Sequence, residues 1–266
     1  MVDRLRCPRC GGTRWWRLRS GKRRCAACRH DRRVGTGLPL RLTRPEWRRL
    51  LYFFSLGLSG AQIANESGLR RERVLRALLL VRSAMGRDIP PVFSGVVEVD
   101  ETYVGGAWRN QRQAKREQGT KRGRGVATKQ PVFGILARGG QVWAEVVPNV
   151  QRATLQRLIK QRVELGSTVC TDTYGAYTGI AAGGYVHRMV EHGKRYSDRQ
   201  GGHINGLEGF WGYLKRRLAA KGGIRQERLH LYIAEYAWRY NHRKLSSREQ
   251  VKILLKLIQV RPGGHE

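Results

Sequence analysis

The sequence has few acidic residues. It contains 20 Asp and Glu against 52 Lys and Arg among 266 residues, a formal net charge of +32. This excess is far larger than solubility requires, and it predicts strong, salt-dependent attraction to a polyanion. Nucleic acid is the expected partner, with an acidic membrane surface or a ribosomal location as the alternative. Because carboxylates are so scarce, those within apolar segments are candidate functional groups.

The sequence also lacks long apolar runs. No segment approaches the roughly 18 apolar residues that a membrane-spanning helix needs, and Met1 to Cys7 hold no apolar signal segment. We therefore expect a cytoplasmic protein with no membrane partner and with reduced cysteines. A chain of this length has room for one domain of moderate size and one or two small ones.

Cysteine is scarce too, and four of the five cysteines form one pattern: two Cys-x-x-Cys pairs separated by fourteen residues. Two such pairs are typical of one tetrahedral, structural Zn²⁺ site. A segment this short cannot bury its own core, so the metal should supply its folding energy. We predict a zinc ribbon over residues 1–35, with Cys7, Cys10, Cys25 and Cys28 as the ligands.

Aromatic and basic residues are interleaved between the two cysteine pairs. This composition favours contact with nucleic acid, by stacking and by pairing with phosphates. The alternative is that the tryptophans only pack the ribbon. The candidate DNA-binding residues here are Arg14, Trp15, Trp16 and Arg17.

Residues 40–88 resemble a helix-turn-helix DNA-binding domain. Thr43 and Glu46 stand at the N-cap and third position of a first amphipathic helix. A later helix ends near Gly68, where a turn is predicted, and a plain helical linker is the alternative. The recognition helix would begin with Arg70, Arg71 and Arg73, where base edges and phosphates are reached.

From residue 92 to residue 260, the order of predicted elements is that of an RNase H-like α/β fold. A strand over 96–104 is followed by a hairpin, a helix, two further strands and two helices. The later elements are expected at 131–138, 141–147, 152–164, 167–172, 185–190, 208–218 and 229–240. In such a fold, the first and fourth strands lie side by side.

Three carboxylates in this segment predict a divalent-metal site. Asp100 lies in the first strand, Asp172 ends the fourth, and Glu208 stands at a helix start, with thirty-five residues between the last two. Mg²⁺ prefers hard carboxylate oxygens. Two such ions, about 3.5–4 Å apart, can activate an attacking oxygen and stabilise a leaving one. Each carboxylate alone is more simply a solvated residue, but the three together favour phosphodiester chemistry.

The chain resembles bacterial insertion-sequence transposases of the DDE type, in particular the zinc-ribbon subgroup, the insertion-sequence fifteen-ninety-five family. The matching stretches are residues 99–106, 171–177 and 203–211, followed by Lys215-Arg216, and residues 238–243 resemble the closing helix of that family. The resemblance covers nearly the whole chain. Its motifs are specific in combination and weak one at a time.

The resemblance implies roles for individual residues. Asp100 and Asp172 would bind two Mg²⁺ or Mn²⁺ ions, and Glu208 would complete the site. Asn205 is the alternative third ligand. Lys215 would contact the terminal phosphate of the element end; His203 and Asn205 would contact DNA or tune the metals, and Arg216 is a further DNA-binding candidate.

Two glutamates beside Asp100 compete with it. Strand alternation leaves Glu98 on the same face as Asp100 and turns Glu101 to the other side. Cys170, the fifth cysteine, lies in the fourth strand and is expected to be a buried thiol.

The activity implied by the resemblance is DNA transposition. Water would hydrolyse the strand at the element end, and the freed 3′-OH would attack target DNA. The partners would be double-stranded DNA, as terminal inverted repeats and as target, and further copies of the chain in a dimer or larger assembly. The alternatives are a non-catalytic DNA-binding regulator derived from a transposase, and an RNase H-like nuclease that cuts without joining.

Overall fold

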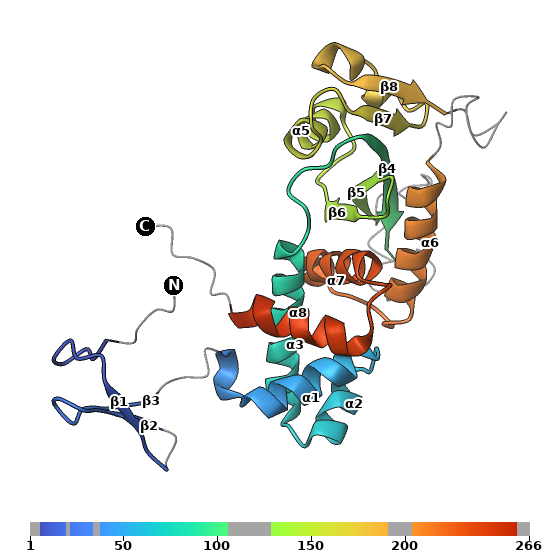
Figure 1. Ribbon diagram of the computed structural model, residues 1–266. Coiled ribbons are helices and arrows are strands. Elements are labelled where there is room, and N and C mark those ends of the chain that lie inside the picture. Colours follow the sequence, from blue (N-terminus) through green and yellow to red (C-terminus); the bar gives the residue numbers. More distant parts are fainter. Residues whose placement is uncertain (1–5, 20–21, 34–37, 106–128, 191–203, 260–266) are drawn as a thin grey trace. The chain divides into compact units, whose positions relative to one another are not determined.

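The structure is a computed structural model, and it describes residues 6–19, 22–33, 38–105, 129–190 and 204–259 (Figure 1). The chain divides into two compact units, Met1–Ala77 with Val251–Glu266, and Leu78–Gln250. Within the described residues, no helix is both long and apolar enough to cross a membrane.

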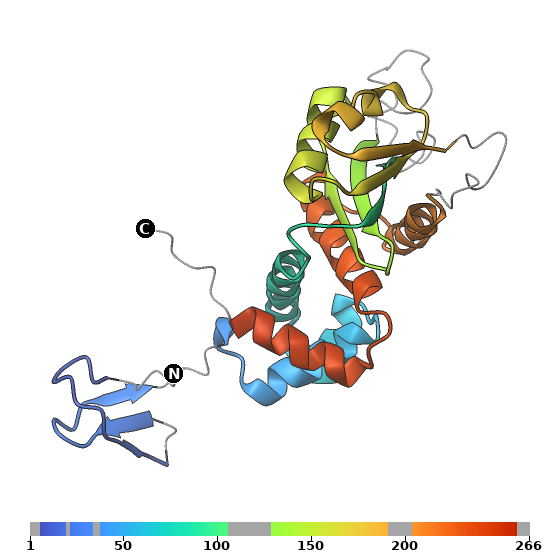
Figure 2. The ribbon, with the colours of Figure 1, turned by 45° about the horizontal axis from the view of Figure 1, so that its top comes forward.

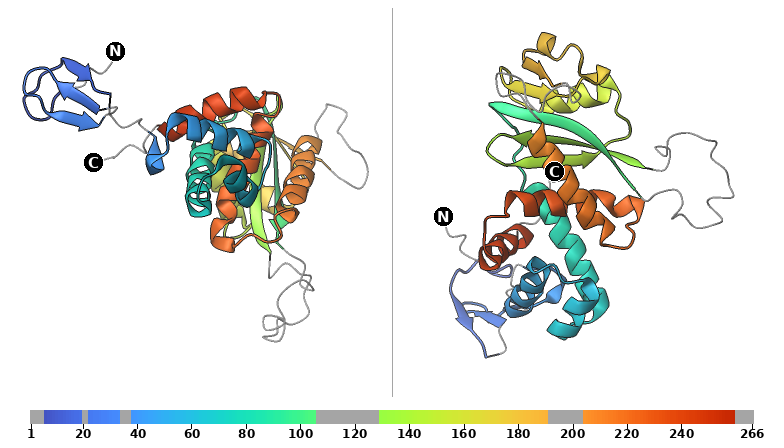
Figure 3. Two further views of the ribbon diagram at one scale, coloured as in Figure 1. Left: turned by 90° about the horizontal axis from the view of Figure 1, so that it is seen from below. Right: turned by 90° about the vertical axis from the view of Figure 1, so that its right-hand side faces the viewer.

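The first unit begins with a small antiparallel sheet in the order β1-β2-β3. Its strands are β1 (Trp15–Arg17), β2 (Lys22–Cys25) and β3 (Asp31–Arg33), the three blue arrows in Figure 3. Cys7 and Cys10 precede β1, Cys25 ends β2, and Cys28 lies in the turn between β2 and β3.

The same unit contains the helices predicted before the RNase H-like segment. Helix α1 (Arg44–Ser55) begins with a full capping box, in which the Thr43 hydroxyl accepts from the Glu46 N–H and Glu46 accepts from the Thr43 N–H. Helix α2 (Gly60–Ser67) ends at Gly68, whose positive φ of 70° suits glycine. Helix α3 (Arg71–Arg87) begins in this unit and ends in the second. The remaining elements are η1 (Pro39–Arg41) and α8 (Ser247–Gln259), which begins in the second unit and ends in the first.

The second unit is built on a five-stranded mixed sheet in the order β6-β5-β4-β7-β8. Strands β5 and β6 run antiparallel to β4, whereas β7 and β8 run parallel to it. This strand order is that of an RNase H-like fold, and it confirms the predicted fold class. The strands are β4 (Val96–Val104), β5 (Gln130–Ala137), β6 (Val142–Val146), β7 (Thr168–Thr171) and β8 (Val186–Met189).

Helices cover both faces of this sheet, with α5 and α6 on opposite sides (Figure 2). Odd-numbered residues of β4, such as Val97 and Val99, pack with α5 (Arg152–Arg162) in one core. The other face packs against α6 (Asn205–Ala219) and α7 (Leu229–Asn241). Three short 3₁₀ turns complete the unit: η3 (Gly175–Tyr177), η4 (Ala181–Gly183) and η5 (Gln226–Arg228).

Two residues of the closing-helix motif, Trp238 and Asn241, form hydrogen bonds that connect α7 to other parts of the second unit. The Asn241 side chain accepts from the Val142 N–H (2.8 Å) and donates to the Val142 carbonyl (2.9 Å), so it continues the ladder of the edge strand β6. The Trp238 indole donates to Asp88 (2.7 Å). Trp238 and Trp211 are buried, and Cys170 is buried as predicted.

Candidate functional site

The sheet register brings Asp100 and Asp172 to the same level. The last parallel pair between β4 and β7 joins Glu98 to Cys170. Asp100 lies two residues after Glu98, and Asp172 lies two residues after Cys170, so both aspartates stand just beyond the last parallel pair. Because side chains alternate between the faces of a sheet, both lie on the same face. The prediction that the first and fourth strands are neighbours is confirmed.

Glu98 joins strand β4 to the beginning of α6, the helix that carries Glu208. Its Oε2 accepts from the Leu207 N–H at 2.8 Å, and this satisfies one of the free N–H groups of the first helical turn. Glu98 is only 1% exposed, and Arg138 lies 4.0 Å from its other oxygen. A Cβ at Gly206 would stand 3.0 Å from this carboxylate, so glycine permits the close approach.

A second hydrogen bond joins α6 to Asp100 itself. The Trp211 indole N–H donates to Asp100 Oδ2 at 2.9 Å. The ring fits because the residue paired with Asp100 on β5 is Gly134. A Cβ at position 134 would lie 2.6 Å from the Trp211 ring, closer than two non-bonded carbon atoms can approach. Asp100, Gly134 and Trp211 therefore form one packing unit.

Asp100 and Asp172 concentrate negative charge at the ends of β4 and β7. Burial, together with the charges of Asp172 and Glu208, raises the pKa of Asp100 to about 6, against the opposing effect of the Trp211 hydrogen bond. Within the described part of the chain, no cationic side chain forms an ion pair with Asp100 or Asp172. In a protein of net charge +32, this local concentration of acid fits a divalent cation.

The carboxylates are spaced more loosely than the cysteines. Among the described residues, the four cysteines are the set of three or more metal-ligating side chains whose atoms lie within 4.8 Å of one another. The donor set of Asp100, Asp172 and Glu208 suits hard cations such as Mg²⁺, which keep several waters and do not need every ligand in close contact.

Glu101 points away from this site, as strand alternation predicts. It accepts a short hydrogen bond from the hydroxyl of Tyr177, which is buried in the α5 core. Burial, and then the charges of Asp100 and Asp172, raise the pKa of Glu101 to about 7. Glu101 is therefore held by Tyr177 on the opposite face of β4 from Asp100.

The Asp172 side chain is held by the backbone that follows β7, because its Oδ1 accepts from the Tyr174 N–H at 2.9 Å.

One exposed face of α6 carries the remaining predicted residues. Asn205, Glu208, Lys215 and Arg216 are all exposed, while Leu207, Phe210, Leu214 and Leu218 form the buried face. Asn205 lies three residues before Glu208 and Lys215 seven after it, so all three share this face. His203 lies outside the described residues.

The predicted zinc ligands converge. Cys7 Sγ lies 3.5 Å from Cys28 Sγ, and Cys10 Sγ lies 3.5 Å from Cys25 Sγ. The backbone N–H groups of Cys28 and Ala27 lower the pKa of the Cys25 thiol to about 6. Four sulfur atoms, of which one favours the thiolate, fit a tetrahedral Zn²⁺ site.

The predicted DNA-binding residues of the first unit are accessible. Arg70, Arg71 and Arg73 are exposed at the start of α3. In the ribbon, Trp16 is 54% exposed, Arg14 and Arg17 are exposed, and Trp15 is half-buried.

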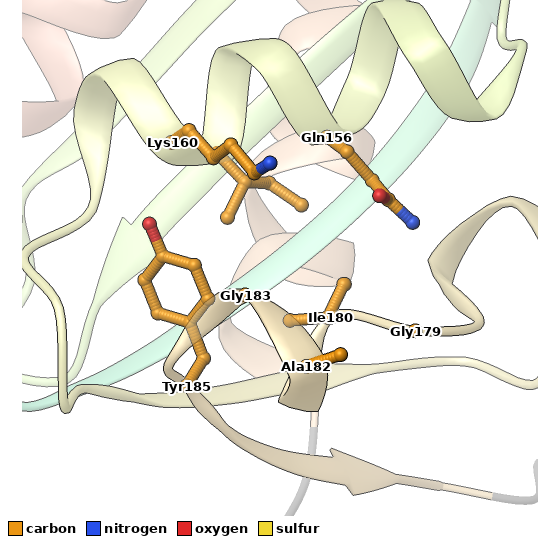
Figure 4. Close-up of a pocket in the computed structure, with 8 residues that line it drawn as sticks. Gln156, Lys160, Gly179, Ile180, Ala182, Gly183 and Tyr185 are labelled. Atoms are coloured by element: carbon orange, nitrogen blue, oxygen red, sulfur yellow. The ribbon is translucent and has the colours of Figure 1, made fainter.

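A cavity of about 170 Å³ lies between α5 and the turns after β7 (Figure 4). None of the three carboxylates lines it. Two of its polar side chains bind the backbone: Gln156 donates to the Ala176 and Thr178 carbonyls, and Tyr185 donates to the Val163 carbonyl. Lys160 lines it as well. The cavity is therefore separate from the candidate site.

Sequence reasoning missed the links that position the acids. Nothing in the sequence connected Trp211 with Asp100, and Glu98 was considered only as a rival ligand. The pairing of an acidic strand residue with a glycine on the next strand, Asp100 with Gly134, leaves no signal in a single sequence, because their register is set by the sheet.

Replacing Trp211 with Phe is expected to weaken metal binding about tenfold. The change keeps an aromatic ring but removes the N–H that holds Asp100 Oδ2, together with the outer indole atoms that lie over Gly134. Partners of metal ligands typically contribute 10–100-fold. Calorimetric titration of the zinc-loaded protein with Mn²⁺ measures this. Trp143→Phe is the control, because Trp143 is buried in the opposite core. Equal Mn²⁺ affinity for the two variants would contradict the assignment.

Comparison with known proteins agrees with this architecture. Residues 92–241 match the ISXO2-like transposase domain family. An uncharacterized transposase-like protein of Haemophilus influenzae is 35% identical over 119 residues, which cover 45% of this chain and 94% of that protein.

Solved structures show weaker likeness. The catalytic core of BIV integrase is 17% identical with a TM-score of 0.36, covering 61% of this chain and 95% of that one. A chain of the simian T-cell lymphotropic virus intasome complex with the PP2A regulatory subunit B56 gamma is 13% identical with a TM-score of 0.35, covering 73% and 68%. A pre-cleavage Mos1 transpososome chain is 11% identical with a TM-score of 0.27, covering 84% and 80%. These scores are too low to carry a functional conclusion. The family match spans more than half of the sequence, including Asp100, Asp172 and Glu208, and the chain therefore belongs to the ISXO2-like transposase domain family.

Proposed function

We propose that this protein is a DNA transposase that binds the terminal inverted repeats of an insertion sequence, hydrolyses the DNA at the element ends and joins the 3′-OH ends to target DNA. The observation that carries the proposal is the level position of Asp100 and Asp172 on neighbouring parallel strands, with the charge of Glu208 near enough to raise the pKa of Asp100. Family membership supports the same activity.

Asp100, Asp172 and Glu208 would hold two Mg²⁺ or Mn²⁺ ions, with Asn205 as the alternative third ligand. When bound, the ions would activate the attacking oxygen and stabilise the leaving one. Trp211 orients Asp100 and Glu98 fixes the start of α6, so the chain itself sets the separation of the acids.

The reaction consists of two exchanges at phosphorus. Water attacks the phosphodiester at the element end, the P–O3′ bond breaks, and a 3′-OH and a 5′-phosphate result. The 3′-OH then attacks a target phosphodiester, so one P–O bond forms while another breaks. No nucleotide cofactor is required because the number of phosphodiester bonds is unchanged in the joining step.

We assign the zinc ribbon (1–35) and the helix-turn-helix (40–88) to recognition of the repeats, and residues 92–260 to catalysis. Arg70, Arg71 and Arg73 would reach the DNA from the recognition helix. Lys215 and Arg216, exposed on the same helix as Glu208, would bind phosphates close to the reacting bond. Base contacts would give specificity and phosphate contacts most of the affinity. Because two ends must be processed together, a homodimer or larger assembly on DNA is part of the proposal.

Two other functions fit parts of the molecule. A DNA-binding regulator would use the ribbon and the helices without needing the carboxylates. An RNase H-like nuclease would use the carboxylates without joining strands. The level position of Asp100 and Asp172 beside the exposed face of α6, with neither aspartate in an ion pair within the described residues, favours an enzyme over a regulator.

A strand-transfer assay distinguishes the three. Labelled duplex carrying the sequence that flanks the gene is incubated with the full chain in Mg²⁺ and, separately, in EDTA. We expect cleaved and joined products in Mg²⁺ only. Cleavage without joining would indicate the nuclease. Specific binding with neither product, under conditions that support a paired complex, would overturn the transposase proposal in favour of the regulator.

A further inference from the structure

One aromatic side chain of the second unit is exposed, and it lies beside the acids. Among the described residues of Leu78–Gln250, Tyr174 is the one Phe, Tyr or Trp that is exposed, with 42% of its surface accessible. Tyr174 follows Asp172 by two residues, and its backbone N–H donates to Asp172 Oδ1 at 2.9 Å. A large aromatic surface is thus available to a ligand at the carboxyl end of β7, next to a candidate metal ligand.

The Tyr174 ring is held in place although it is exposed. It packs edge-on with the buried Tyr177, with ring centroids 6.2 Å apart and an interplanar angle of 81°. Its hydroxyl lies 3.5 Å from the Val150 carbonyl oxygen, in the segment before α5. Because a T-shaped contact uses at most one face of a ring, Tyr177 leaves the other face of Tyr174 uncovered.

Helix α5 holds the turn that carries this ring. The Gln156 side chain donates to the Ala176 carbonyl at 3.1 Å and to the Thr178 carbonyl at 2.9 Å. Arg152 donates to the Gly175 carbonyl at 3.4 Å. An aromatic ring on a turn fixed in this way loses little conformational entropy when a ligand covers it, so the ring is preorganised for binding.

The proposed reaction frees a base that such a ring can bind. In a continuous duplex, neighbouring bases cover both faces of each base, and unstacking them is unfavourable. Hydrolysis at the element end breaks the P–O3′ bond, so the base of the nucleotide that carries the 3′-OH is no longer linked to its neighbour. One face of this terminal base can then be uncovered at the site of joining.

We infer that the Tyr174 ring stacks on the terminal base of the DNA strand whose 3′-OH is joined, and so holds this end beside Asp100 and Asp172. The inference rests on the proposed function for its ligand and deepens it by adding a contact to a base. Every base offers an aromatic face, so the contact holds the strand without reading its sequence.

The two sides of the sheet would hold the strand by different chemistry. Tyr174 is fixed by α5, whereas Lys215 and Arg216 are exposed on α6, on the opposite side of the sheet (Figure 2). The two cations would bind phosphates, and these contacts weaken as the salt concentration rises. The ring would bind the apolar face of the base, so the reacting end is held from both sides of the acids.

The test combines one protein change with one DNA change. Tyr174→Leu removes the ring but keeps the backbone N–H that binds Asp172, and a terminal nucleotide without its base removes the stacking partner. The DNA is a pre-cut duplex end, with the cut position mapped in the strand-transfer assay, and joining by the full chain in Mg²⁺ is measured in single-turnover reactions. We expect each change alone to slow joining about tenfold. Together they should slow it within about twofold of either one, because both remove the same contact.

Two further variants and one binding measurement serve as controls. The conservative change Tyr174→Phe keeps the ring and should recover most of the joining that Tyr174→Leu loses. Thr173→Ala changes an exposed neighbour in the sequence and should join at the native rate. Calorimetric titration with Mn²⁺ should give the same affinity for Tyr174→Leu and the native protein, since the bond to Asp172 is retained.

Three results would overturn the inference: native joining by Tyr174→Leu, losses that multiply when the two changes are combined, or a weakened Mn²⁺ affinity in Tyr174→Leu that accounts for its slower joining. The last result would mean that Tyr174 acts only through Asp172. Failure of the proposed function is seen separately, as absence of Mg²⁺-dependent joining by the native protein on the unmodified DNA.

Discussion

Asp172→Asn should lower Mg²⁺-dependent strand joining by at least roughly 1000-fold, about 4 kcal/mol in the reaction barrier, while DNA binding stays within about twofold. The described side-chain contact of Asp172 is the hydrogen bond that its Oδ1 accepts from the Tyr174 N–H. An asparagine oxygen can accept the same bond, so the backbone after β7 is retained. What disappears is one negative charge and one hard oxygen ligand of the metal site.

Glu101→Gln is the matched control for this loss. Glu101 is a carboxylate next to Asp100 in sequence, but it binds Tyr177 on the opposite face of β4. We expect it to retain joining within about tenfold, because the amide can still accept from the Tyr177 hydroxyl. Both variants are measured by the rate of product formation in single-turnover reactions. A native rate for Asp172→Asn would remove Asp172 from the site, and equal losses in both variants would move the site to the other face.

Cys25→Ser should release the zinc and unfold the ribbon. Among the described residues from 6 to 33, the buried side chains are Cys7 and Cys25, both of which point into the sulfur cluster. The segment has no apolar core to replace the metal, and structural zinc contributes about 10–16 kcal/mol in comparable small domains. We expect loss of the bound metal, loss of hydrogen-exchange protection over β1 to β3, and DNA binding weakened by more than tenfold.

Cys170→Ala is the control for the zinc prediction. Cys170 is buried within the five-stranded sheet, far along the chain from the cluster. This variant should keep one zinc per chain and full protection of the ribbon strands, although the sheet itself is destabilised by the small cavity. Metal content is measured by atomic absorption. A folded ribbon in metal-free Cys25→Ser protein would contradict the prediction.

Local patterns in the sequence predicted most of the helices and strands. The apolar alternation of residues 96–104 predicted β4 at its observed bounds, and the Thr43 and Glu46 pair predicted the start of α1. Cysteine spacing predicted the sulfur cluster. Helix α8 was not predicted, although Ser246 and Glu249 form a capping interaction that a search for N-caps would have found.

The sequence by itself determined the element order, the four-cysteine cluster and the three acidic candidates, because helix periodicity, strand alternation and ligand spacing are local properties of the chain. Only the tertiary structure decided how the acids are held. Trp211 and Asp100 are 111 residues apart, and Glu98 and Leu207 are 109 apart. Such contacts depend on strand register and helix packing, which a single sequence does not encode locally.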